Sequence, residues 1–175
     1  AMGWALPACF GAWTIDKRKP YFCLSGDGSL MMNIQELATI QFHQMPLKLF
    51  VINNGGYAMI KQTQDQWLGS EYIASNKGKD LGFPNFEKLA DSFGMKYLPV
   101  NTVDELRKNE EELTNNTDAC FIEITVPPDA RVIPQVKFGR PNEDMEPLLP
   151  REIFKRNMII ETLVPAKAHW YDKIL

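Results

Sequence analysis

The chain has 175 residues, of which 45% are hydrophobic and 23% are charged, and its formal net charge at pH 7 is −3. That length predicts one compact domain or one domain with a tail, since domains hold roughly 150 residues, and the composition excludes the disordered and fibrous classes. The negative charge argues against nucleic-acid binding and no apolar run reaches the roughly 18 residues that cross a bilayer, so we expect a soluble, cytoplasmic protein.

Strands and helices are predicted in alternation from the start of the chain to about residue 128. Residues 3–13 are rich in Ala, Gly and bulky apolar side chains, which indicates a buried helix with Pro7 in its first turn. Continuous apolar runs predict buried parallel strands at 21–25, 47–52, 95–100 and 120–126. Apolar residues at helical spacing predict helices at about 31–43, 57–66, 86–93 and 102–113. The alternation indicates an α/β fold, a doubly wound, mostly parallel sheet with helices on both faces.

Two segments fall outside this alternation. Residues 68–84 are polar and contain glycine, and a loop of that length is typical of a functional lid. After Pro127 and Pro128 the chain is rich in proline and lacks periodicity until 151–161, where one more helix is predicted. We therefore expect an α/β domain over residues 1–128 and an irregular C-terminal extension over residues 129–175.

Cysteine and histidine offer little chemistry in this chain. Cys9, Cys23 and Cys120 form no CxxC pair and have no histidine near them, so we expect buried, small apolar side chains in a reducing compartment. His43 and His169 are the only histidines. A zinc site or a histidine-based triad would therefore have few side chains to build on.

Two predicted strands end in loops suited to a ligand. Gly26-Asp27-Gly28-Ser29 follows the first strand, Asn53-Asn54-Gly55-Gly56 follows the second, and open parallel sheets bind ligands beyond the carboxyl ends of their strands. Each loop alone is more often a simple turn or helix cap. The two loops are separated by one helix and one strand, and such a unit brings the ends of both strands side by side. Together they therefore predict a single site.

The first of these loops places backbone N–H groups and a hydroxyl at a helix start, which favours a phosphate. Asp27 would repel that phosphate unless a divalent cation lay between them. Mg²⁺ commonly binds one or two protein oxygens together with substrate phosphates. The amide oxygen of Asn54 and a nearby backbone carbonyl would complete an octahedral oxygen cage that holds a diphosphate.

The segment GDGSLMMNIQELATIQFHQMPLKLFVINNGGY resembles the thiamine-diphosphate motif of the pyruvate oxidase, acetolactate synthase and decarboxylase superfamily. The resemblance extends over about residues 1–140, from AMGWALPACFGA to VPPDARVIP. Met31 stands where the Rossmann fingerprint G-x-G-x-x-G requires glycine. The resemblance implies the cofactor-binding, C-terminal domain of such an enzyme, most similar to the acetolactate synthase large-subunit group.

Residue roles follow from this resemblance. It implies three metal ligands: Asp27, the side chain of Asn54 and the carbonyl of Gly56. It implies a diphosphate site formed by Gly26, Gly28 and Ser29. It also implies that Met2 forms an apolar wedge under the cofactor. The thiazolium side of the cofactor would be lined by Tyr57, Ala58 and Met59. For Met2 and Met59 the alternative is plain core packing, and Gln62 and Gln64 either reach a substrate or lie on a solvated helix face.

In this family the cofactor is activated by a glutamate on a separate pyrimidine-binding domain of the partner subunit. Nothing in this chain resembles that domain, so no catalytic residue is assigned here and the isolated chain is expected to be inactive. The chain starts at Ala1, directly before Met2, which predicts a fragment of a homodimeric or homotetrameric enzyme. A flavin (FAD) in a missing domain is compatible with this resemblance.

The resemblance implies decarboxylation of a 2-keto acid such as pyruvate. Ile60 stands where simple decarboxylases have a glutamate, which favours transfer of the acyl unit to a second carbonyl compound. Thr63 stands where an acetolactate synthase has tryptophan, which leaves the substrate open. The alternatives are a 2-keto acid decarboxylase, a non-catalytic regulatory module that keeps the fold, and a phosphate-binding hydrolase, against which the absence of a nucleophile or base counts.

Overall fold

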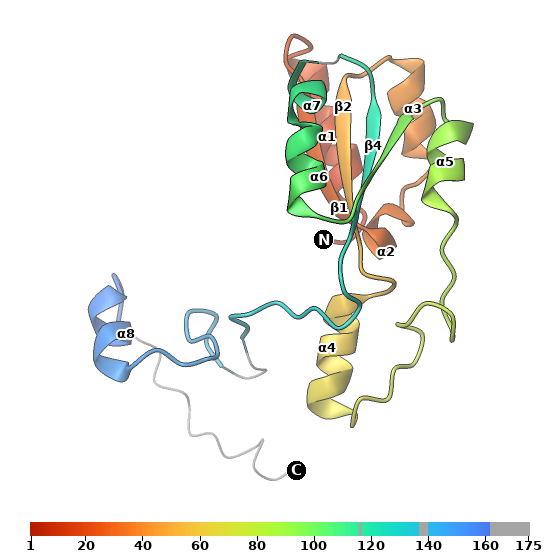
Figure 1. Cartoon of the computed structure of the whole chain (residues 1–175). Helices are drawn as coiled ribbons and strands as arrows, with labels where there is room; N and C mark the ends of the chain where they lie inside the picture. The colour runs from red at the N-terminus through yellow and green to blue at the C-terminus, as the bar shows by residue number, and fades with distance from the viewer. Residues whose placement is uncertain (116, 137–139, 162–175) are drawn as a thin grey trace. The chain divides into compact units, whose positions relative to one another are not determined.

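The computed structural model describes residues 1–115, 117–136 and 140–161, and its internal contacts separate two units, Ala1–Ala130 and Arg131–Leu175. The first unit contains four parallel strands: β1 (Tyr21–Gly26), β2 (Leu47–Asn53), β3 (Lys96–Val100) and β4 (Cys120–Thr125). They lie in the order β1-β2-β4-β3, with β2 and β4 at the centre of the sheet (Figure 1). The predicted α/β fold with a parallel sheet is confirmed.

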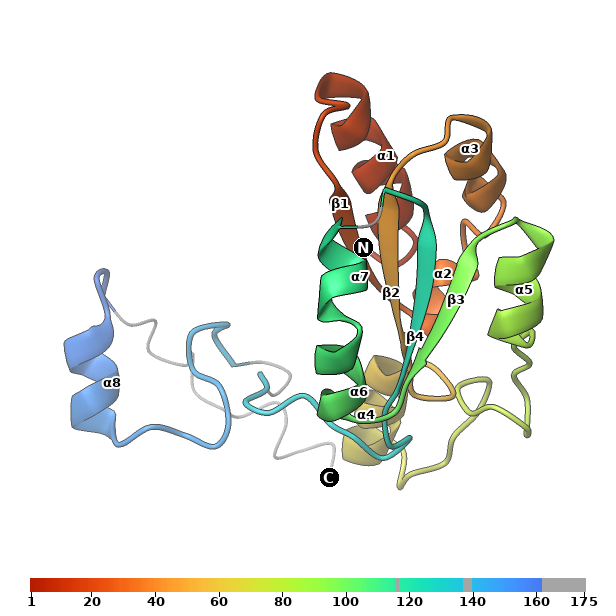
Figure 2. The same cartoon turned by 45° about the horizontal axis from the view of Figure 1, so that its top comes forward.

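Each face of the sheet has its own core. Against one face pack α1 (Ala5–Ile15), α3 (Glu36–Phe42) and α5 (Phe86–Ser92), over the fully buried side chains of Leu47, Leu49 and Val51. Against the other pack α6 (Val103–Lys108) and α7 (Glu110–Asn115), over Cys120 and Ile122. Figure 2 shows α6 and α7 on the opposite side of the sheet from α3 and α5. Burial on both faces explains the continuous apolar runs of the central strands β2 and β4. The edge strand β1 is buried on one face only, because Phe22 and Leu24 are 50% and 67% exposed, so the prediction of a buried strand there is wrong for that face.

Four helices differ from their predicted extents. The helix expected at 31–43 is shortened to α3, because residues 31–35 form turns that follow a separate short helix, α2 (Asp27–Leu30). The helix expected at 102–113 starts as predicted, with the Thr102 side chain accepting from the Glu105 N–H, but breaks at Asn109 into α6 and α7. The first helix starts at Ala5 because Gly3 has a φ of +78°, outside the helical region.

The fourth difference lies in the second unit. There α8 (Arg151–Asn157) ends four residues before the predicted end at 161, and the following Met158 is extended. The carboxylate of Asp144 is buried, and Arg151 Nη1 donates to both of its oxygens, at 2.9 and 3.0 Å. Residues 162–175 of the expected extension lie outside the described part of the chain. Within the described residues, no helix is long and apolar enough to cross a membrane.

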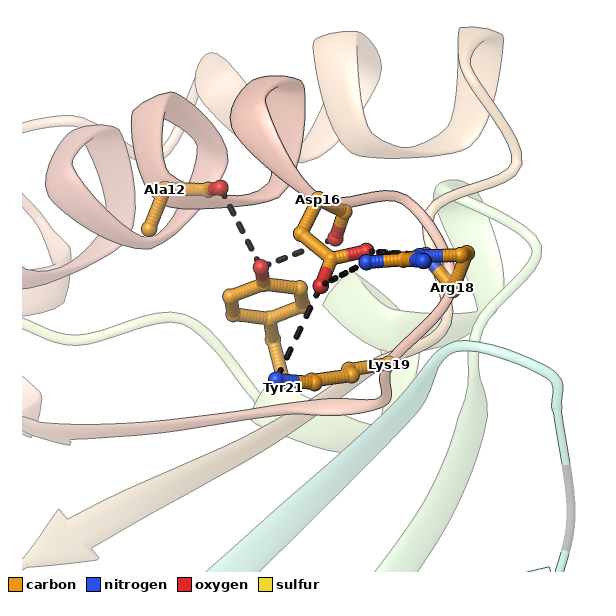
Figure 3. Close-up of polar contacts among 5 residues, drawn as sticks. All are labelled: Ala12, Asp16, Arg18, Lys19 and Tyr21. Atoms are coloured by element: carbon orange, nitrogen blue, oxygen red, sulfur yellow. Dashed lines mark hydrogen bonds and ion pairs between the residues drawn. The ribbon is translucent and has the colours of Figure 1, made fainter.

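A compact turn joins α1 to β1. The Tyr21 hydroxyl lies 3.1 Å from the carbonyl oxygen of Ala12 and 2.9 Å from that of Asp16 (Figure 3). Within the turn, the Asp16 carboxylate accepts from the backbone N–H and the guanidinium of Arg18. These hydrogen bonds lower the pKa of Asp16. The C-terminal end of α1 is thereby held against the start of β1.

The loop at 68–85 is tied to α4 (Ala58–Trp67) and to the turn after β2. The buried Gln64 side chain donates to the Ile73 carbonyl at 2.9 Å and accepts from the Ser75 hydroxyl at 2.5 Å. The Ser75 carbonyl then accepts from the N–H of Tyr57, and the N–H of Lys77 donates to the Gly55 carbonyl. Gln64 therefore neither lies on a solvated face nor remains free for a substrate, because its amide holds this loop.

At Gly56 this loop approaches the turn closely. A Cβ atom added to Gly56 would lie 2.3 Å from the carbonyl oxygen of Ser75, a backbone atom that cannot move aside alone. By contrast, a Cβ atom added to Gly11, in α1, meets nothing within 4 Å. The turn after β2 therefore requires glycine at position 56 for steric reasons.

We expect Gly56→Ala to lower the free energy of unfolding by about 1–3 kcal/mol, the usual range for forcing extra volume into a packed site. Gly11→Ala is the matched control, and it should be neutral or stabilising by up to about 1 kcal/mol, because alanine has the higher helix propensity. Urea unfolding measures both. Equal midpoints for Gly56→Ala and the unmodified protein would contradict the close contact with Ser75.

Candidate functional site

The two loops singled out in the sequence lie side by side at the carboxyl ends of β1 and β2. These strands pair in parallel, with Gly26 opposite Ile52, so the residues that follow each strand emerge at the same edge of the sheet. A hydrogen bond joins the two loops, from the Gly56 N–H to Asp27 Oδ2 at 3.1 Å. The structure thus brings together Asp27 and Gly56, two of the three expected metal ligands.

Asp27 is a buried carboxylate, with 1% of its surface exposed. Burial raises its pKa, while N–H groups that include those of Gly28, at 2.7 Å, and Gly56 act in the opposite direction. No hydrogen bond or ion pair among the described residues joins Asp27 to a lysine or arginine. An ionised carboxylate in this place therefore favours a bound cation, which would supply the charge that the chain does not.

Asn54 carries an unsatisfied acceptor. Its Oδ1 atom is buried and has no hydrogen-bond partner among the described residues, and such an orphan costs roughly 1–3 kcal/mol. Gly55 follows in the left-handed region with a φ of +68° and turns the chain sharply at this point. A buried amide oxygen of this kind indicates a position reserved for a donor or a cation that is not part of the chain.

The neighbouring Asn53 has a different role. Its Nδ2 donates to Glu123 Oε1 on β4 at 2.5 Å, and its Oδ1 accepts from the Gly55 N–H at 3.1 Å. The other oxygen of Glu123 accepts from the Tyr97 hydroxyl on β3 at 2.6 Å. Asn53 therefore shapes the turn, and of the two asparagines only Asn54 has an oxygen to offer a ligand.

The ring of Tyr57 leaves no room for a side chain at Gly28. A Cβ atom added to Gly28 would lie 2.3 Å from the ring of Tyr57, the residue directly before α4. The predicted diphosphate loop and the predicted thiazolium-side lining are therefore in direct contact. Ala58 and Met59 follow as the first residues of α4, and Met59 is 59% exposed. Met59 therefore does not belong to the core.

The N-terminal segment lies against the diphosphate loop. The Gly3 N–H donates to the Ser29 hydroxyl at 2.9 Å, and the Asn33 side chain donates to the Gly3 carbonyl at 2.5 Å. Met2, next to Gly3, is 47% exposed, so core packing does not explain it. Sequence reasoning missed Asn33, which lies inside the quoted motif segment but was given no role there. Its role depends on a contact with a residue 30 positions earlier.

The oxygen donors in this site suit a hard cation. Carboxylate, amide and backbone carbonyl oxygens are the ligands that Mg²⁺ takes in proteins, together with phosphate oxygens. Among the described residues there is no group of three or more His, Cys, Asp and Glu side chains that could hold a metal. The expected ligand set contains one carboxylate only, so a cluster of that kind is not required. The metal-ligand roles of Asp27, Asn54 and Gly56 remain predictions.

Comparisons with known proteins bear on the same residues. Residues 1–124 match the family described as thiamine pyrophosphate enzyme, C-terminal TPP binding domain, where thiamine pyrophosphate is another name for thiamine diphosphate. The chain is 33% identical over 144 residues to the acetolactate synthase large subunit of Porphyra purpurea, which covers 82% of this chain and 24% of that protein.

Two further relatives give the same picture. The acetolactate synthase isozyme 1 large subunit of Escherichia coli K12 is 31% identical over 144 residues, 82% of this chain and 25% of that protein. Acetolactate synthase 1, chloroplastic, of Zea mays is 30% identical over 149 residues, which are 83% of this chain and 23% of that protein. The chain therefore spans about a quarter of the length of these relatives. On the match over residues 1–124, the chain belongs to the thiamine pyrophosphate enzyme family, of which it carries the C-terminal cofactor-binding domain.

Proposed function

We propose that this domain binds the diphosphate of thiamine diphosphate through Mg²⁺ in an acetolactate synthase-like enzyme. That enzyme would decarboxylate a 2-keto acid such as pyruvate and transfer the acyl unit to a second carbonyl compound. The observation that carries this proposal is the buried, unpartnered Oδ1 of Asn54 in the loop that bonds to the buried carboxylate of Asp27. The names of the relatives support the reaction class.

Each residue of the site has a separate task in this proposal. Asp27, Asn54 and the Gly56 carbonyl hold the cation. Ser29 already accepts a hydrogen bond from Gly3 through its oxygen, so its own proton remains available to donate to a phosphate oxygen. When bound, the cofactor supplies a stabilised carbon nucleophile for 2-keto acids, while the protein supplies orientation and charge.

The remaining parts of the active site would come from elsewhere. We propose that the activating glutamate belongs to the pyrimidine-binding domain of a partner subunit, in a homodimer or homotetramer, and that this chain alone is inactive. Met2 would then support the cofactor from below, and Tyr57, Ala58 and Met59 would line its thiazolium side. The half-exposed Met2 and the exposed Met59 are compatible with such contacts, because neither side chain is used in the core.

Ile60 bears on the choice of product. It lies in the first turn of α4 and is 46% exposed, so an apolar side chain faces outward beside the proposed cofactor lining. An apolar group there offers no proton to a reacting centre, whereas a carboxylic acid would. This difference favours transfer to a second carbonyl compound over release of an aldehyde.

The first prediction concerns the cation. In the intact protein, Asp27→Asn should weaken binding of thiamine diphosphate in the presence of Mg²⁺ roughly a hundredfold, because truncating one partner of a buried charge pair costs about 2–5 kcal/mol. Isothermal titration calorimetry with and without Mg²⁺ measures this. Asp16→Asn, which removes an equal charge from a distant turn, should bind normally. Unchanged affinity for Asp27→Asn, or metal-independent binding by the unmodified protein, would refute the proposed cage.

The second prediction concerns the product. Ile60→Glu should raise the share of aldehyde among the products formed from pyruvate severalfold, because the new carboxylic acid can supply a proton. Ile60→Leu keeps the size and apolar character of the side chain, so its product ratio should match that of the unmodified enzyme. Chromatographic product analysis at equal conversion distinguishes the two. If Glu and Leu variants give the same ratio, position 60 does not control the product.

A further inference from the structure

The first four residues form a tight turn with Met2 at its tip. The Trp4 N–H donates to the Ala1 carbonyl at 3.3 Å, and Gly3 has a φ of +78°, as the third position of a type II turn requires. Met2 therefore occupies the second position of the turn, and its side chain is 47% exposed. The turn thus presents an apolar side chain outside the core.

Both backbone polar groups of Gly3 are held by side chains from the predicted diphosphate loop and the turn that follows it. The Gly3 N–H donates to the Ser29 hydroxyl at 2.9 Å, and Asn33 Nδ2 donates to the Gly3 carbonyl at 2.5 Å. Figure 1 marks the N-terminus close to α2, the helix that contains Ser29. These two contacts fix the position of the N-terminal turn relative to the loop.

The contact between Gly3 and Asn33 is close and partly shielded from water. A Cβ atom added to Gly3 would lie 2.9 Å from Asn33 Nδ2 and 2.9 Å from the Cβ atom of Met32. The Asn33 side chain also accepts a hydrogen bond from Gln35 Nε2 at 3.3 Å, and that bond is exposed, whereas the bond to Gly3 is partly buried. Because water competes less with a buried hydrogen bond, the contact with Gly3 is the stronger of the two.

We propose that Asn33 is a positioning residue for Met2 at the cofactor site. Under the proposed function, on which this inference rests, Met2 supports the rings of the cofactor and Ser29 binds its diphosphate. Asn33 contacts neither part of the cofactor, but by holding the Gly3 carbonyl it keeps the adjacent Met2 in place before the cofactor arrives. A side chain that is already in place loses less conformational entropy on binding, which raises the affinity.

Calorimetry with two ligands distinguishes this role from a general loss of the site. Thiamine diphosphate carries the rings that Met2 would contact, whereas pyrophosphate carries phosphates only. In the intact protein with Mg²⁺, Asn33→Leu should weaken binding of thiamine diphosphate about three- to tenfold, the effect of losing one hydrogen bond, and should leave pyrophosphate binding unchanged. Equal weakening for both ligands would overturn the proposal, because Asn33 would then shape the diphosphate loop itself. Unchanged binding of both would overturn it as well.

A double variant tests whether Asn33 acts through Met2. Met2→Ala should weaken binding of thiamine diphosphate, and adding Asn33→Leu should cause little further loss, because the side chain that Asn33 positions has then been removed. Fully additive losses would overturn the proposal. Gln35→Ala is the matched control: it removes the exposed hydrogen bond to Asn33 and should bind thiamine diphosphate as the unmodified protein does.

Hydrogen–deuterium exchange in the cofactor-free, intact protein gives a readout that does not depend on binding. Asn33→Leu should speed amide exchange in peptides that cover residues 2–5 and leave α3 unchanged. Equal exchange at residues 2–5 in both proteins would overturn the proposal. Circular dichroism checks folding, and Asn33→Ala, which adds no bulk, replaces Asn33→Leu if that variant does not fold. An unmodified protein that binds neither ligand would instead contradict the proposed function.

Discussion

The buried carboxylate of Asp27 is the constraint on which the geometry of this domain depends. A charge in that environment must be compensated, and the chain provides backbone N–H groups from two loops but no basic side chain among the described contacts. To deliver the N–H of Gly56, the turn after β2 must lie within hydrogen-bonding distance of β1. Hydrogen bonds to Ser75 and Lys77 of the long loop hold that turn in place. The long loop is itself bound to α4 through the side chain of Gln64. The need to compensate this one charge thus fixes the positions of both loops, and with them the positions of their oxygen atoms.

The sequence predicted the four strands and the loops that follow β1 and β2 well, because continuous apolar runs that end abruptly are typical of parallel strands. Helix limits and side-chain roles were predicted less well where they depend on contacts between residues far apart in the sequence. Residues 31–35, expected to be helical, form turns beside two hydrogen bonds, one from the Gly3 N–H to the Ser29 hydroxyl and one from the Asn33 side chain to the Gly3 carbonyl. No local sequence pattern predicts these two contacts. The different roles of Asn53 and Asn54 depend on Glu123, a residue 70 positions away. The sequence likewise could not show that Gln64 is buried, because this depends on its hydrogen bonds to Ile73 and Ser75 of the long loop.

Membership of the thiamine pyrophosphate enzyme family gives these observations a common explanation. The described residues bring the buried carboxylate of Asp27 and the unpartnered amide oxygen of Asn54 to one edge of the sheet, and the apolar side chains of Met2 and Met59 are exposed. The chain spans about a quarter of its relatives. Under the proposed function, its own residues anchor charge, while the cofactor and other domains supply the reacting groups.

The hydrogen-bond chain from Tyr97 through Glu123 and Asn53 to the N–H of Gly55 has one further consequence. It crosses the sheet from the edge strand β3 to the loop that carries Asn54, so it acts as a brace across three strands. A braced loop loses little conformational entropy when a ligand binds, which favours tight binding. Selection for cofactor affinity would therefore act on Tyr97 as well, although this residue lies two strands away from the loop it steadies.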